Sequence, residues 1–188
     1  MARRLAGEVA GAGIRGEALF QVLEAYRLAM VPRMERLVGD DPAFLHPARS
    51  ALILLADVGG ATPSVLAASI LVESEEAELR AGAERVEEVL GRAVAEVLES
   101  VPSSGPGLLP RLLAADEDAR LITLAERLDQ VRHVHLRSPG ALRRMHRQTR
   151  DIYLPVASRT HRTLERRFRR WYDATAERAG IGDEPGHR

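Results

Sequence analysis

Apolar residues recur at helical spacing through almost the whole sequence, and this periodicity limits the possible fold more than any other feature. The segment 17–37 places five apolar side chains on one helix face, and leucines recur in the same way in the segment 116–136. The five residues of the first face are Leu19, Val22, Leu23, Tyr26 and Met30. No stretch shows the strict alternation of a half-buried strand. The pattern predicts an all-α protein with many helices.

Capping residues predict where several of these helices begin. Thr62 precedes Pro63, and Ser138 precedes Pro139. A hydroxyl residue at the N-cap followed by proline at the first helical position is typical of a helix start. We expect the segment 84–101 to form one amphipathic helix. Pro32 should kink or end the first long helix.

The composition favours one compact domain. With 188 residues, 45% of them hydrophobic, the chain can bury a single core, and a second domain would be cramped. We expect residues 1–180 to form this domain and residues 181–188 to be a disordered tail. The absence of cysteine excludes disulfides and cysteine-based zinc sites. Neither a signal-peptide core nor a membrane span is present in the sequence, so we expect a cytoplasmic protein without a membrane partner.

The charges are unevenly distributed although the formal net charge is zero. The segment 73–100 is acidic, whereas the segment 143–170 is rich in arginine. A solvated helix with Glu–Arg pairs explains the basic end most simply, and binding of nucleic acid or of a nucleotide phosphate is the alternative. Aromatic residues make up only 4% of the chain, so stacking surfaces for nucleic-acid bases are scarce and a nucleic-acid partner is not expected.

The histidines differ in their sequence surroundings. His133 and His135 are two positions apart, which directs them to different sides of a helix and predicts surface positions. His146 lies in an arginine-rich helix and is also expected to be solvated. His46, by contrast, opens a strongly apolar helix with Pro47 at its first turn. It should lie between core and water, where ligands are commonly bound.

Four segments resemble a known family when they are taken in order: HPARSALIL, AASILVESEE, LITLAERLDQVRHV and TRDIYLPVASR. The series is similar to the HD-type hydrolase domain of the RelA/SpoT alarmone family, which typically reads HP..VA..L, AALLHDVVEDT, KLADRLHN.RT and T.EIY.PLA.RLG. The segment VLGRAVAEVLESV is similar to that family's FG..VA.LV.GV. The resemblance runs from about Leu37 to Arg159 and implies a single multi-helix HD-type domain.

The resemblance also implies a reaction and a metal site. Members of this family hydrolyse the 3′-pyrophosphate of a guanosine alarmone with a divalent ion, usually manganese, held by a His, a His-Asp pair and a later Asp. His46 matches the first of these ligands, Val72 and Glu73 fall on the pair, and Glu126 falls on the last. The family's water-activating acids fall on Glu76 and Ala77, so Glu73 and Glu76 are the candidate catalytic residues.

The departures from the family pattern predict an eroded metal site. Val72 has no lone pair, and each Asp-to-Glu change lengthens the ligand arm by one methylene. The remaining donors, His46, Glu73 and Glu126, could hold Mn²⁺ or Mg²⁺ only weakly. We therefore expect weak or no ordinary hydrolase activity, with binding of a guanosine nucleotide or another phosphorylated small molecule retained. The candidate substrate-binding residues, placed by resemblance and helix register, are Arg36, Arg49, Gln130 and Arg159.

Two functions of other classes stay open. Carboxylates clustered in a partly apolar pocket raise one another's pKa, so the same pocket could support metal-independent acid–base catalysis. Val72 continues the apolar stripe of Val65 and Ala68, as expected if the site has become part of the core. In that case the protein would be a non-catalytic helical interaction module that uses its arginine-rich last helix.

Overall fold

The computed structural model describes residues 1–36, 45–73, 82–133 and 138–176, and within these ranges it contains helices and connecting segments but no strand. The all-α prediction is confirmed. The α-helices are α1 (Ala2–Gly11), α2 (Gly16–Arg36), α3 (His46–Ile53), α4 (Pro63–Leu71), α5 (Ala83–Leu90), α6 (Arg92–Ser100), α7 (Leu108–Ala114), α8 (Glu117–Arg132), α9 (Pro139–Gln148), α10 (Leu154–Thr160) and α11 (Arg162–Thr175). Two π-helical turns, η2 (Leu54–Val58) and η5 (Thr149–Tyr153), extend α3 and α9.

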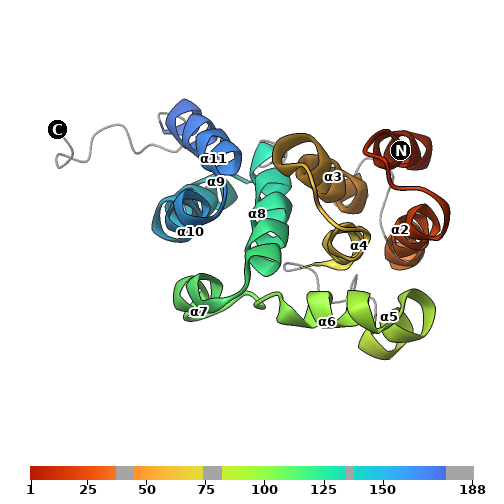
Figure 1. Ribbon diagram of the computed structural model, residues 1–188. Coiled ribbons are helices and arrows are strands. Elements are labelled where there is room, and N and C mark those ends of the chain that lie inside the picture. The colour runs from red at the N-terminus through yellow and green to blue at the C-terminus, as the bar shows by residue number, and fades with distance from the viewer. Residues whose placement is uncertain (37–44, 74–81, 134–137, 177–188) are drawn as a thin grey trace.

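Helix α8 lies at the centre of the molecule (Figure 1). It contacts α3 and α4 on one side and α10 and α11 on the other, with α6 and α7 packed near its N-terminal half. Helices α1 and α2 lie beyond α3 and α4. Every residue from Leu121 to Val131 is buried, so α8 has no solvent-facing side along this length. Polar residues within it must therefore find partners within the helix itself or on the surrounding helices.

Local capping signals predict the helix starts correctly. The Thr62 hydroxyl accepts a hydrogen bond from the Val65 amide at 3.3 Å. The Ser138 hydroxyl accepts one from the Ala141 amide at 3.3 Å. Each bond satisfies an amide that the first turn of a helix leaves without an intrahelical acceptor.

One helix boundary differs from the prediction. The segment 84–101 is broken at Gly91, where φ is 84° and ψ is 165°, so it forms α5 and α6 instead of one helix. This region of backbone space is almost restricted to glycine. Of the two outcomes predicted for Pro32, an early end of the helix is excluded, because α2 continues through it to Arg36. Among the helices of the described residues, none combines the length and apolar character needed to cross a membrane.

The prediction that His146 is solvated is wrong. Its side chain is buried, and its Nε2–H donates to the Tyr172 carbonyl oxygen at 3.0 Å. The imidazole also stacks on the Tyr172 ring, with 3.8 Å between centroids. Helix α11 covers this side of α9, which the local sequence of α9 does not reveal.

Candidate functional site

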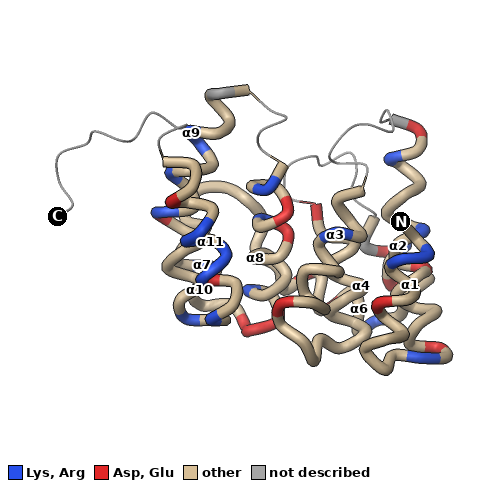
Figure 2. Tube along the Cα trace, turned by 90° about the horizontal axis from the view of Figure 1, so that it is seen from above, with Lys and Arg blue, Asp and Glu red and all other residues tan. Residues whose placement is uncertain are grey.

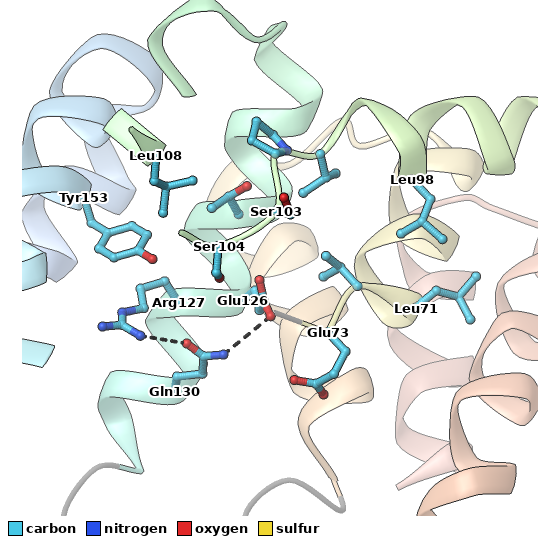
Figure 3. A pocket seen from close by; sticks show the side chains of 14 residues that line it. Leu71, Glu73, Leu98, Ser103, Ser104, Leu108, Glu126, Arg127, Gln130 and Tyr153 are labelled. Carbon is cyan, nitrogen blue, oxygen red and sulfur yellow. Dashed lines mark hydrogen bonds between the residues drawn. The ribbon is translucent and has the colours of Figure 1, made fainter. Parts of the chain in front are cut away.

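A cavity of about 130 Å³ lies where the end of α4 faces α8 (Figure 3). Polar and apolar side chains line it in nearly equal measure. Those from α4, its C-terminal extension and the α6–α7 region are Leu71, Val72, Glu73, Leu98, Val101, Pro102, Ser103, Ser104 and Leu108. Those from α8 and η5 are Thr123, Glu126, Arg127, Gln130 and Tyr153.

The α8 wall of the cavity is a chain of hydrogen-bonded polar groups. The Gln130 amide donates to Glu126 Oε1 at 3.4 Å, and Arg127 Nη1 donates to Gln130 Oε1 at 3.1 Å (Figure 3). The Arg127 guanidinium lies 4.8 Å from the centroid of the Tyr153 ring, within cation–π range. Sequence reasoning missed both Arg127 and Tyr153. The i, i+3 spacing of Arg127 and Gln130 was the available signal for the first of them.

Glu73 is engaged by an arginine that sequence reasoning also missed. Arg33 of α2 is 1% exposed, and its Nη2 donates to Glu73 Oε2 at 2.6 Å. Its Nη1 donates to the Ala29 carbonyl at 2.8 Å. Glu73 is itself buried. A charge-assisted bond of this length neutralises a carboxylate that would otherwise be costly to bury.

His46 is hydrogen-bonded to the buried carboxylate of Asp129. Its Nδ1–H donates to Asp129 Oδ2 at 2.7 Å, and Arg49 Nε donates to Asp129 Oδ1 at 2.7 Å. Within the part of the chain that the structure describes, the buried His46 Nε2 has no hydrogen-bond partner.

The surroundings of this pair shift both pKa values. Burial lowers the pKa of His46, but the Asp129 hydrogen bond and the charges of Asp129, Glu126 and Glu73 outweigh it, so the pKa is raised. Burial raises the pKa of Asp129, but hydrogen bonds from His46 and Arg49 outweigh this effect, so the pKa is lowered. The pair is therefore stabilised in its ionised form.

The structure brings together only some of the predicted site residues. Glu73, Glu126 and Gln130 line the same cavity. His46 is close enough for both carboxylates to raise its pKa, although it is not among the lining residues. Arg49 lies instead on a second hollow, together with Asp129.

The remaining predicted residues lie elsewhere. Arg159 is exposed on α10 and does not line the cavity. Glu76 and Ala77 fall outside the described residues, as do residues 181–188. Arg36 ends α2, and its side chain is not described.

The donor set does not fit the metal site that the resemblance implies. Val72 offers no ligand atom, and the Glu73 carboxylate is already bound by the Arg33 guanidinium. Among the described side chains, no three of the His, Asp and Glu type lie in a metal-binding arrangement.

No protein-family model matches the sequence, and a search among curated proteins gives no significant match. The resemblance to the HD-type domain therefore remains a prediction that rests on the quoted motifs.

Proposed function

We propose that this protein is a divergent HD-type domain whose cavity binds a phosphate group of a small molecule, such as a guanosine nucleotide, without the metal-dependent hydrolysis of its ancestors. The observation that carries this proposal is the buried Arg33–Glu73 ion pair. A guanidinium supplies the positive charge beside Glu73 that a divalent ion supplies in a hydrolase of this type. A fixed cation of this kind can neutralise charge but cannot deprotonate a bound water in the way a metal can.

One part of the cavity wall offers donors to an anion, whereas the carboxylates of Glu73 and Glu126 lie on another part. Arg127 contributes a guanidinium, Gln130 an amide, and Ser103 and Ser104 hydroxyl groups. Arginine and such neutral donors are the groups that bind phosphate oxygens in proteins. The volume of about 130 Å³ is well below the roughly 300–1,000 Å³ of a typical ligand pocket. It suits one phosphate group, with the rest of the molecule lying outside.

Calorimetric titration with GTP, GDP and orthophosphate, in EDTA and again with manganese, tests this function. We expect binding in EDTA that manganese does not strengthen, and no manganese-dependent release of phosphate or pyrophosphate. Arg127→Gln should weaken nucleotide binding by about tenfold or more, because a charge-assisted bond is lost. The matched control is Arg85→Gln, since Arg85 pairs with Glu88 on the surface of α5.

A second variant separates a binding defect from a folding defect. Ser104 is exposed and lines the cavity, so Ser104→Phe adds a bulky ring at the wall without disturbing the core. It should block phosphate binding in a protein with an unchanged melting temperature. Binding that survives both variants, or turnover that requires manganese, would rule out the proposed function.

A further inference from the structure

A groove of about 650 Å³ runs between α8 and α11, on the side of α8 opposite the cavity. The cavity is lined by positions 123, 126, 127 and 130 of α8, whereas the groove is lined by positions 128 and 132. At 100° per residue, these two sets lie on opposite faces of the helix. The groove is lined by Leu128, Arg132, Thr163, Arg166, Arg167, Arg170, Trp171 and Ala174.

One face of α11 supplies most of this lining. Positions 163, 166, 167, 170, 171 and 174 follow the spacing that places side chains in a single row along a helix. Figure 2 shows the basic positions recurring along α11. Its core face is formed by Leu164 and Phe168, which are buried. The arginines of the groove are therefore not needed to pack the helix.

The groove concentrates positive charge. No acidic side chain of the described residues lines it. Asp57 of η2 does not line the groove, but it forms an ion pair with Arg167. Loss of hydration and the positive charge of Arg167 lower the pKa of Arg132, although Asp57 and Asp129 oppose this shift. The fold thus holds like charges close together, an arrangement that a bound anion would stabilise.

A second hollow of about 270 Å³ continues the groove, because both are lined by Arg132 and Arg167. It adds two more arginines, Arg4 and Arg49. Two carboxylates also line it: Asp129 binds Arg49, and Asp57 pairs with Arg167. Guanidinium groups therefore extend beyond a single phosphate-sized site.

We propose that the α8–α11 groove binds a small molecule that carries two or more linked phosphate groups, with a planar or apolar part against Trp171. Its volume falls within the range of small-molecule sites. Arginine forks match phosphate oxygens in pairs. Leu128, Ala174 and the Trp171 indole form an apolar wall beside the charges. This site is independent of the phosphate-binding function proposed for the cavity.

The single tryptophan of the chain makes the test direct. Inorganic tripolyphosphate does not absorb near 300 nm, so it can be titrated while Trp171 fluorescence is recorded, with calorimetry in parallel. We expect saturable binding at about 0.15 M salt, a change in Trp171 emission, and affinity at least about tenfold above that of orthophosphate because several guanidinium groups contribute.

Matched double variants distinguish binding in the groove from a general effect of the positive charge on α11. Arg166→Gln with Arg170→Gln should weaken tripolyphosphate binding by about tenfold or more. Arg162→Gln with Arg169→Gln removes the same charge from another face of α11, where Arg169 pairs with Glu165, and should change the affinity by less than about threefold. The cavity variant Ser104→Phe should leave this binding unchanged, so failure of either proposed site is recognised separately.

Two results would overturn the proposal. The first is absence of binding at millimolar tripolyphosphate, and the second is equal weakening by the two double variants. Tighter binding of a single-stranded oligonucleotide, lost equally in both, would point instead to a nucleic-acid surface spread over the helix.

Discussion

The guanidinium of Arg33 in α2 and the carboxylate of Glu73, just beyond α4, form an ion pair of 2.6 Å that is withdrawn from solvent. It joins two helices that already pack against each other. Opposite charges buried in this way depend on each other, because either one alone would lie in the core without compensation.

We expect Arg33→Met to lower the free energy of unfolding by about 3–5 kcal/mol, since it leaves the Glu73 carboxylate buried without its partner. Arg33→Met combined with Glu73→Leu should recover most of this loss, because the double variant buries no charge. Urea unfolding measures both values. Arg92→Met is the control: Arg92 and Glu96 form an exposed pair, and its loss should cost far less than loss of the buried pair. Equal effects of Arg33→Met and Arg92→Met would show that the core does not depend on the buried pair.

The same ion pair should block restoration of a metal site. We expect the triple variant Val72→His, Glu73→Asp, Glu126→Asp to show no manganese-dependent rise in melting temperature while Arg33 is present. Adding Arg33→Met frees the carboxylate, and manganese at a hundredfold excess over its dissociation constant should then raise the melting temperature by about 5–10 °C. Differential scanning fluorimetry with and without EDTA measures this shift. A manganese response in the triple variant that retains Arg33 would contradict the prediction.

His46 and Asp129 should give the protein a stability that depends on pH. The pKa of His46 is raised in the folded state, so the folded protein keeps a proton that the unfolded chain releases above about pH 6.5. The free energy of unfolding should therefore fall as the pH rises from about 6.5 through the folded-state pKa. The lowered pKa of Asp129 adds a loss of stability as the pH falls below about 3.9.

Urea unfolding between pH 5 and 9 measures the histidine contribution. His46→Gln removes the titrating group, so its stability should be lower at pH 6 and should decline less between pH 6.5 and 9. Identical slopes for the two proteins in this range would assign the pH dependence to another group.

Gly91 should be intolerant of a side chain. Its φ of 84° and ψ of 165° are strained for any other residue, so Gly91→Ala should cost about 1–3 kcal/mol, even though open space surrounds the position. Gly7→Ala is the matched control inside α1, where open space and helical backbone should give a gain of about 0.5–1 kcal/mol. Thermal unfolding should move the two melting temperatures in opposite directions. A stabilising Gly91→Ala would mean that α5 and α6 are joined without a break.

The helical class and several helix starts could be predicted because they depend on local signals. Thr62 and Ser138 act within their own first turns, so the residues that follow are enough to identify them. Gly91 was also a local signal, but the apolar periodicity continues on both sides of it and conceals the break.

The partners of the site residues could not be predicted, because they come from distant parts of the chain. Arg33 reaches Glu73 across 40 positions, and His46 reaches Asp129 across 83. The resemblance placed Glu73, Glu126 and Gln130 on one cavity, but it carried no information about which cation would neutralise Glu73. Helix register likewise failed for Arg159, since the packing of α10 decides which way that side chain points.

Because α8 is buried from Leu121 to Val131, hydrogen exchange in this helix should report the unfolding of the whole molecule. Its amide hydrogens are enclosed by helices from both halves of the chain, so no local fraying can expose the middle of the helix to water. Hydrogen exchange there should require opening of the entire fold and should be the slowest in the protein. Deuterium uptake in this one segment would consequently measure global stability, whereas uptake on the exposed face of α5 would report only local opening.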